Sequence, residues 1–243
     1  MIEFRGRLVL LDIEGTVSPL AFVHDVLFPY ARREVGDFLM RHQASPDALS
    51  ALEQIARDSG LGSNGEGTST NLASDSDRAA WVTRIHALMD ADAKQTGLKW
   101  LQGLIWDEGY RSGELKSVLF SDAVESIQLW HRSGLRLRIY SSGSIAAQRL
   151  FFAYSDRGDW TGCLEGYHDT TTGPKRAVAS YQAIVEAAGL PASEILFLSD
   201  VTEELDAALE AGCQTAWVVR PGNKPGQTDR HPTLRSFAEI QLS

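Results

Sequence analysis

Residues 7–16 read Arg-Leu-Val-Leu-Leu-Asp-Ile-Glu-Gly-Thr, and this stretch decides the fold. A continuous apolar run as short as Leu8 to Leu11 fits a strand that is buried on both faces of a parallel sheet. Two acids, Asp12 and Glu14, follow the run, and the glycine after them is typical of a turn. We therefore expect a buried strand that carries two carboxylates at its carboxyl end.

Further strands are predicted over residues 135–140, 195–199 and 215–219. Stripes of apolar residues at helical spacing precede or separate these strands, and a glycine ends each stripe. Alternation of strand and helix is the pattern of a parallel sheet with helices on both faces. The predicted fold class is therefore α/β.

Residues 20–116 interrupt the alternation, because their apolar residues recur at helical spacing only. We expect four helices here, and Ser45-Pro46 is a typical start for one of them. The expected domains are an α/β catalytic core, residues 1–19 and 117–243, and an all-helical cap, residues 20–116, inserted after the first strand. A cap at the carboxyl end of a strand lies over the usual ligand crevice of such sheets.

Residues 60–65 read Gly-Leu-Gly-Ser-Asn-Gly and match the dinucleotide fingerprint G-x-G-x-x-G. That fingerprint needs a strand before the glycines and a helix after them. Here a helical pattern precedes the glycines and a stretch rich in Gly, Ser and Thr follows. The context favours a flexible loop of the cap over a nucleotide site.

Composition narrows the possible partners. The 243 residues include 23 Lys and Arg against 32 Asp and Glu, a net charge of −9, whereas nucleic acid is bound through excess positive charge. No apolar run approaches the roughly 18 residues of a membrane span, and the one before Asp12 is too short for a signal peptide. Cys163 and Cys213 lack disulfide or zinc spacing. We expect a cytoplasmic, reduced protein without nucleic acid or membrane partners.

Polar side chains follow three of the predicted strands, and Lys175 follows a turn at Gly173-Pro174. The set comprises Asp12, Glu14, Ser141, Ser142, Lys175 and Asp200, with Glu203 and Glu204 shortly after. Each alone could be a turn former, a helix cap or a surface charge. The carboxyl ends of parallel strands, however, meet at one edge of the sheet, so together these residues predict a site.

Carboxylates crowded at one edge repel one another unless positive charge compensates them. Lys175 supplies one charge, and a divalent cation would supply two. Oxygen ligands suit Mg²⁺, whereas the six histidines show no spacing that would suit zinc. With hydroxyl and ammonium donors for a phosphoryl group, the set indicates phosphoryl transfer with an aspartate nucleophile.

These motifs, in this order, resemble those of the haloacid-dehalogenase-like phosphohydrolases and, more closely, the enolase-phosphatases of methionine salvage. The resemblance spans about residues 8–240 and rests on residues 10–16, 22–31, 101–103, 139–144, 197–202 and 218–223. It implies a Rossmann-like parallel-sheet core with an inserted helical cap, dependence on Mg²⁺ and a monomer.

The implied reaction takes a small phosphorylated diketone, 2,3-diketo-5-methylthiopentyl-1-phosphate. The enzyme enolises the diketone and then removes the phosphate, which gives the acireductone 1,2-dihydroxy-3-keto-5-methylthiopentene. The residues expected to bind the phosphate are Ser141, Ser142 and Lys175. The base of the enolisation step is not identified by the sequence.

The resemblance also implies catalytic and metal-binding roles. Asp12 would attack phosphorus and form an aspartyl phosphate, and Glu14 would protonate the leaving oxygen and then activate water. A glutamate acts as an acid near neutral pH only if its site raises its pKa. Mg²⁺ would be held by Asp12 and Asp200, with Glu14 adding its side chain or its carbonyl oxygen. Glu204, four residues after Asp200, would support these ligands.

Three alternatives use the same residue types. Another capped, Mg²⁺-dependent small-molecule phosphatase would share the site and differ in the cap. A phospho-acceptor signalling module also combines Asp, Ser or Thr, Lys and Mg²⁺, but its aspartate lies on a middle strand and it lacks a long helical insertion. A metal-free dehalogenase would have no comparable use for Glu14 and Asp200.

Overall fold

The computed structural model describes residues 1–60, 72–226 and 228–243. These divide into two compact units, an α/β unit of Met1–Val23 with Lys116–Ser243 and a helical unit of His24–Leu115. The sequence predicted the break at residue 20 rather than at His24. The difference arises because Phe22 is buried and its ring packs against Phe151 of the α/β unit, with 5.8 Å between centroids.

Six parallel strands form the main sheet of the α/β unit, in the order β4-β3-β2-β5-β6-β7. They are β2 (Leu8–Leu11), β3 (Arg136–Tyr140), β4 (Gly166–His168), β5 (Ile195–Ser199), β6 (Gln214–Val218) and β7 (Thr233–Leu234). In the centre, Leu8 pairs with Arg136 on one side and with Ile195 on the other. All four residues of β2 are buried, as the continuous apolar run predicts. The predicted α/β fold class is confirmed.

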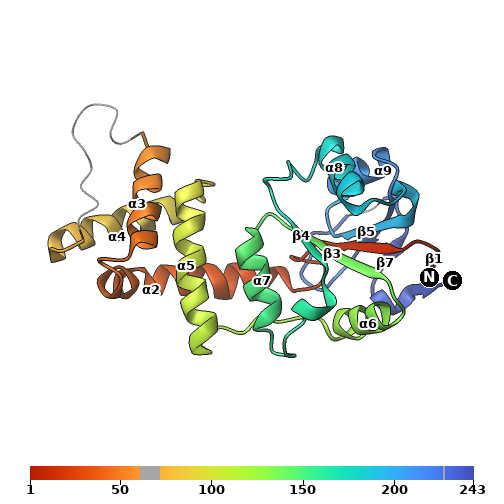
Figure 1. Cartoon of the computed structure of the whole chain (residues 1–243), viewed down its shortest axis with the longest axis horizontal. Helices are drawn as coiled ribbons and strands as arrows, with labels where there is room; N and C mark the ends of the chain where they lie inside the picture. Colours follow the sequence, from red (N-terminus) through yellow and green to blue (C-terminus); the bar gives the residue numbers. More distant parts are fainter. Residues whose placement is uncertain (61–71, 227) are drawn as a thin grey trace. The chain divides into compact units, whose positions relative to one another are not determined.

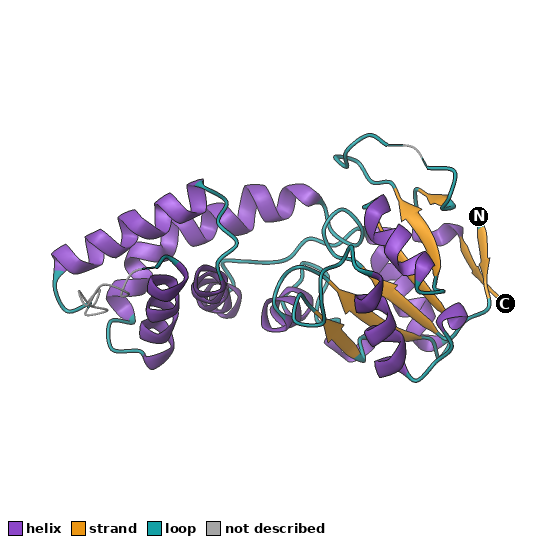
Figure 2. Ribbon diagram, turned by 90° about the horizontal axis from the view of Figure 1, so that it is seen from above, coloured by secondary structure: helices purple, strands orange, loops and turns teal. Residues whose placement is uncertain are grey.

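Two further strands pair in parallel at the ends of the chain, β1 (Ile2–Phe4) with β8 (Ile240–Leu242). Both termini therefore lie side by side (Figures 1 and 2). The sequence analysis did not predict these strands, nor β4 and β7. Strands of two or three residues are too short to show a period, and only their pairing partners define them.

Helices cover both faces of the main sheet (Figure 1). They are α6 (Ser121–Arg132), α7 (Ile145–Ala153), α8 (Val178–Ala188) and α9 (Thr202–Glu210). The unit also contains the single turn α1 (Leu20–Phe22) and the short 3₁₀ turns η2 (Thr161–Cys163), η3 (Ala192–Glu194) and η4 (Phe237–Glu239). Tyr181 of α8 and Leu205 of α9 pack in one core cluster with Leu10 and Phe197 of the sheet. Helix α6 lies on the opposite side of the sheet.

The helical unit begins within a π-helical turn, η1 (Val23–Leu27). Its α-helices are α2 (Phe28–Arg41), α3 (Pro46–Asp58), α4 (Asp75–Asp90) and α5 (Thr96–Ser112). Ser45 caps α3 as predicted, because its side chain accepts a hydrogen bond from the Ala48 N–H. Within the described ranges, no helix is both long and apolar enough to cross a membrane. Apart from Gly60, the glycine motif of residues 60–65 lies outside the described residues.

A buried ion pair ties the C-terminal part of the α/β unit to the loop after β2. Arg220 is 6% exposed, and its Nη1 lies 2.9 and 2.8 Å from the two carboxylate oxygens of Asp122. Its Nε donates to the Thr16 carbonyl at 3.1 Å. The guanidinium also packs against the rings of Phe120 and Phe237, 4.6 and 4.8 Å from their centroids. This pair therefore helps to hold the segment that follows Asp12.

We expect Asp122→Ala to lower the free energy of unfolding by about 3 kcal/mol, because Arg220 then keeps a buried charge without its partner. Burial alone would raise the pKa of Asp122, but the Phe237 N–H and Arg220 lower it below its ordinary value. The folded-state pKa thus lies below the unfolded one. The stabilisation is complete above about pH 4 and is lost as the pH falls through the folded value.

Urea unfolding of the wild type and Asp122→Ala at about pH 7 and about pH 3 tests this prediction. The difference between the two proteins should shrink at the lower pH. A control, Asp229→Ala, removes an exposed carboxylate and should leave stability nearly unchanged at both pH values. An equal loss at both pH values for Asp122→Ala would contradict the argument.

Candidate active site

Asp12 follows β2 directly and is 2% exposed. Its N–H donates to the Leu198 carbonyl of β5 at 3.0 Å, which extends the pairing of β2 and β5 by one residue. The chain then turns sharply, because the N–H groups of residues 16–18 all donate to the Ile13 carbonyl. The sheet and this turn together fix Asp12 beside the end of β5.

Asp200, at the end of β5, lies directly against this turn. Gly15 has a φ of 75°, a conformation that favours glycine. A β-carbon at Gly15 would come within 2.7 Å of the Asp200 Cγ and still nearer to its Oδ2. Asn223 donates from Nδ2 to the Gly15 carbonyl at 2.9 Å, while its buried Oδ1 has no hydrogen-bond partner among the described residues. The turn therefore brings a carboxylate and an amide oxygen close to Gly15.

Lys175 lies between two carboxylates. Its Nζ is 2.6 Å from Asp12 Oδ1 and 2.7 Å from Glu204 Oε2, and its side chain is 10% exposed. Burial alone would lower the pKa of Lys175, but the charges of Asp12 and Glu204 outweigh this effect and raise it. The ammonium is therefore a fixed positive charge beside Asp12.

Ser141, the first residue after β3, is fully buried and holds Glu14. Its hydroxyl donates to the Glu14 carboxylate, with 3.1 Å to Oε2 and 3.3 Å to Oε1, and accepts from the Gly143 N–H at 3.2 Å. Burial and then the charge of Asp12 raise the pKa of Glu14. This is the direction that an acid acting near neutral pH requires.

The other two carboxylates of the site are also shifted toward their protonated forms. Burial, followed by the charges of Asp12 and Glu204, raises the pKa of Asp200 to about 7. Burial, followed by the charge of Asp12, raises the pKa of Glu204 to about 7. Several acids thus share one ammonium, and their mutual repulsion indicates that further positive charge would be stabilising.

The structure connects most of the residues that the sequence singled out. Those joined by the contacts above are Asp12, Glu14, Ser141, Lys175, Asp200 and Glu204. Glu204 is buried within this set, whereas Glu203 is exposed. Ser142 is also exposed, in the loop between β3 and α7, and only its backbone position ties it to the site.

Ser199, the last residue of β5, belongs to the site although the sequence pattern did not indicate it. Its fully buried hydroxyl lies 3.1 Å from Glu204 Oε2 and 3.4 Å from Asp12 Oδ2, and accepts from the Val201 N–H at 3.1 Å. Because Ser199 ends an apolar run, the pattern indicates only that a strand ends there. Its position directly before Asp200 was the available signal.

The oxygen donors around Gly15 fit a magnesium ion. In the part of the chain that the structure describes, no three His, Cys, Asp or Glu side chains are arranged to hold one metal ion. The Glu14 carboxylate is engaged by Ser141, so two carboxylates, Asp12 and Asp200, and the Glu14 carbonyl oxygen are the better set. The unpartnered Asn223 Oδ1 and the raised pKa of Asp200 both mark this turn as short of positive charge. Mg²⁺ prefers such oxygen ligands.

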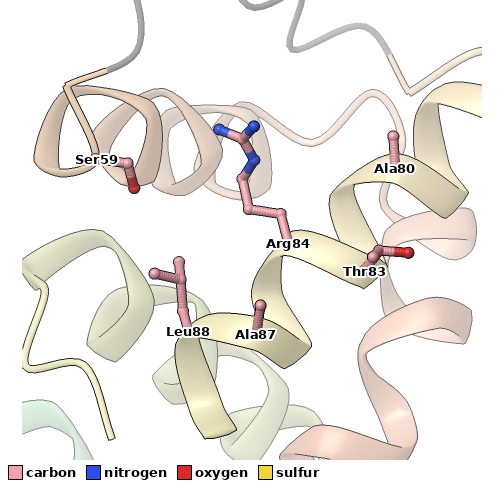
Figure 3. A pocket seen from close by; sticks show the side chains of 6 residues that line it. All are labelled: Ser59, Ala80, Thr83, Arg84, Ala87 and Leu88. Atoms are coloured by element: carbon pink, nitrogen blue, oxygen red, sulfur yellow. The ribbon is translucent and has the colours of Figure 1, made fainter. Parts of the chain in front are cut away.

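A separate hollow of about 510 Å³ lies within the helical unit (Figure 3). Its lining residues are Ser59, Ala80, Thr83, Arg84, Ala87 and Leu88. None of these lining residues carries a carboxylate, and none is a predicted site residue. It is therefore distinct from the site at the sheet edge.

A family model described as a haloacid dehalogenase-like hydrolase matches residues 7–212, which include every residue of this site except Asn223. The parallel sheet and the acids at its carboxyl edge agree with that class. The chain is thus a haloacid dehalogenase-like hydrolase.

Comparison with individual proteins identifies the family within this class. Proteins named Enolase-phosphatase E1 from Pseudomonas aeruginosa (strain UCBPP-PA14) and Synechococcus elongatus are each 45% identical over 96% of this chain, and cover 97% and 96% of their own lengths. The crystal structure of the UTR4 protein from Saccharomyces cerevisiae matches with a TM-score of 0.80 and 33% identity, over 97% of this chain and all of that one. The chain belongs to the enolase-phosphatase E1 family.

Proposed function

We propose that the protein is the enolase-phosphatase of methionine salvage. It converts 2,3-diketo-5-methylthiopentyl-1-phosphate to 1,2-dihydroxy-3-keto-5-methylthiopentene by enolisation and then removal of phosphate. The observation that carries the phosphatase step is the buried Lys175 ammonium, 2.6 Å from Asp12 and 2.7 Å from Glu204. The relatives that are 45% identical carry the choice of substrate.

Asp12 is the proposed nucleophile. A carboxylate oxygen of Asp12 attacks phosphorus, the bond from phosphorus to the substrate oxygen breaks, and an aspartyl phosphate forms. Lys175 stays within reach of both Asp12 and the transferred group, so it stabilises the charge on the phosphoryl oxygens. Ser141 and Ser142 lie in the loop after β3. When phosphate binds, Ser142 supplies a further donor, and the single hydroxyl proton of Ser141 turns from Glu14 to a phosphoryl oxygen.

Glu14 is the proposed acid and base. Its raised pKa lets it give a proton to the leaving oxygen in the first step. The resulting carboxylate then takes a proton from water as that water attacks phosphorus, which releases phosphate and restores Asp12. Before phosphate binds, Ser141 holds the Glu14 carboxyl at the sheet edge.

We assign the magnesium site to Asp12, Asp200 and the Glu14 carbonyl, with Glu204 supporting them through Lys175 and Ser199. When bound, Mg²⁺ supplies positive charge that neutralises phosphoryl oxygens and can polarise the carbonyls of the diketone.

Metal-free protein should lose stability as the pH rises from about 4 to about 7. The folded-state pKa of Asp200, about 7, lies above its unfolded value, so its stabilising contribution is present at low pH and is lost through that range. Bound Mg²⁺ offsets this loss. At a free concentration about 100 times its Kd, Mg²⁺ should add about 2.7 kcal/mol to the free energy of unfolding. At one fixed, sub-saturating concentration of Mg²⁺, the increase should be larger at pH 8 than at pH 6.

Thermal unfolding with EDTA and with Mg²⁺ at about pH 6 and about pH 8 measures this linkage. The control is Asp200→Asn, which should lose both the pH dependence contributed by Asp200 and most of the Mg²⁺ effect. A Mg²⁺-induced shift in Tm that is the same in Asp200→Asn as in the wild type would contradict the assignment of this ligand.

We propose that the helical unit His24–Leu115 is the cap and selects the substrate. Its first helices follow directly on the turn after Asp12. We also propose that the enzyme acts as a cytoplasmic monomer. The two cysteines, which are free thiols, agree with a reducing compartment.

The direct test of the function is an assay with the diketo phosphate. Absorbance follows the enolisation, and release of inorganic phosphate follows the second step. We expect both signals with Mg²⁺, and a kcat/KM well above that for a panel of other small phosphate esters. Phosphate release from another ester at a higher kcat/KM, without enolisation of the diketone, would instead favour a different capped phosphatase.

A further inference from the structure

The backbone of residues 173–175 is held by three buried hydroxyls, which we call the hydroxyl clamp. They belong to Tyr140 at the end of β3 and to Ser180 and Tyr181 of α8, with exposures of 0%, 2% and 0%. The bonds run from Tyr140 Oη to the Gly173 carbonyl at 2.9 Å, from Ser180 Oγ to the Pro174 carbonyl at 2.8 Å and from Tyr181 Oη to the Lys175 carbonyl at 2.7 Å. Three consecutive carbonyls of a loop are thus bound by side chains.

The segment is also packed tightly against α8. Gly173 has a φ of 144°, and a β-carbon there would collide with the Ser180 hydroxyl. Pro174 restricts the next backbone angle. The Pro174 carbonyl accepts a second bond, from the Ala177 N–H at 2.9 Å. The backbone on which the Lys175 side chain starts therefore has little freedom.

The two phenols of the clamp are fixed in the core. The rings of Tyr140 and Tyr181 contact edge to face at 5.5 Å, and Tyr181 also contacts Phe197 of β5 at 5.2 Å. Burial raises the pKa of both phenols, so each keeps the proton that it donates. The clamp thereby links residues 173–175 to the strands that end at the active site.

A lysine needs such support, because its side chain is long and flexible. Lys175 Nζ must nevertheless lie between Asp12 and Glu204, and the Tyr140 ring, 5.8 Å from Nζ, lies beside it as well. A misplacement of about 1 Å in an active site can cost about 100-fold in rate.

We infer that Tyr140, Ser180 and Tyr181 are positioning residues that fix the Lys175 ammonium between Asp12 and Glu204. The inference rests on the proposed function, in which Lys175 binds the phosphoryl group. It extends that function to hydroxyls that touch neither Asp12 nor the ammonium.

The test uses Tyr140→Phe and Tyr181→Phe in the full-length protein with Mg²⁺. Each variant removes one hydroxyl and keeps the ring. Tyr167→Phe is the matched control, since the Tyr167 hydroxyl is buried without a hydrogen-bond partner among the described residues. We expect kcat/KM to fall about 10-fold in each clamp variant, with a similar rise in the inhibition constant of inorganic phosphate. The control should stay within about 2-fold of the wild type.

A double-mutant cycle separates positioning from general stability. In a Lys175→Gln background, adding Tyr181→Phe should change kcat/KM by less than about 2-fold, because the group that Tyr181 positions is already gone. All rates are measured at a temperature where circular dichroism shows each variant fully folded. Additive losses in the cycle would overturn the inference and leave Tyr181 a structural role.

Two outcomes distinguish this inference from the proposed function. If Lys175→Gln loses activity while both clamp variants behave like Tyr167→Phe, the clamp is not needed and only this inference fails. If Lys175→Gln keeps wild-type activity, the role of Lys175 in the proposed function fails, and the inference fails with it.

Discussion

Asp12→Asn should release phosphate at least about 10⁴-fold more slowly than the wild type, with the protein still folded. The amide of asparagine is a poor nucleophile, so the covalent route through an aspartyl phosphate closes. The substitution keeps the size of the side chain and its backbone bond to Leu198. Steady-state phosphate release with Mg²⁺ measures the loss.

The fold should survive this change, because two electrostatic effects oppose each other. The variant loses the Asp12–Lys175 attraction, but it also loses the repulsion by which Asp12 raises the pKa of Glu14, Asp200 and Glu204. Lys175 keeps Glu204 as a partner. We expect Tm to change by no more than about 4 °C. Asp229→Asn, at an exposed position, is the control. Retention of normal turnover by Asp12→Asn would remove Asp12 as nucleophile.

Glu14→Gln should lower kcat by about 10²–10⁴-fold with the natural substrate, because both the acid and the base of the reaction are lost. The glutamine can still accept a hydrogen bond from Ser141, so the geometry of the loop is kept. The loss should depend on the leaving group. An aryl phosphate whose leaving oxygen needs no proton should show a burst of aryl alcohol followed by slow turnover.

That burst separates the two roles of Glu14, since only the second step still needs a base. The matched control is Glu203→Gln, an exposed glutamate next in sequence to Glu204, and it should keep wild-type rates. Equal rate losses for good and poor leaving groups, without a burst, would show that Glu14 is not the acid.

Much of the fold could be predicted because its central strand is buried on both faces. A parallel strand such as β2 shows a continuous apolar run, and so does its neighbour β5, whereas the other neighbour, β3, alternates arginines with apolar residues. The short strands β1, β4, β7 and β8 could not be found, because two or three residues carry no period. The exact start of the cap could not be predicted, because only the contact of Phe22 with Phe151 shows that Phe22 packs with the α/β unit.

The site was predictable where charge and strand ends coincide. The charged side chains of Asp12, Asp200 and Lys175 indicate a metal or phosphate site from their residue types alone. The hydroxyl clamp was not predictable, because a Tyr in an apolar run is most often a packing residue. For Ser199 the one signal was its position directly before Asp200. The contribution of the clamp and of Ser199 depends on hydrogen bonds to carbonyls and carboxylates that lie far away in the sequence, such as the bond of Tyr140 to Gly173.

The nature of the intermediate tests the central claim most directly. The wild-type enzyme, in excess over substrate, is mixed with ³²P-labelled diketo phosphate in the presence of Mg²⁺. The reaction is quenched in acid within one turnover, and the protein is digested for mass spectrometry. We predict a label on the peptide that contains Asp12, with the label absent from Asp12→Asn. A label on Ser141, or phosphate release in single turnovers with no labelled protein at any time, would contradict it.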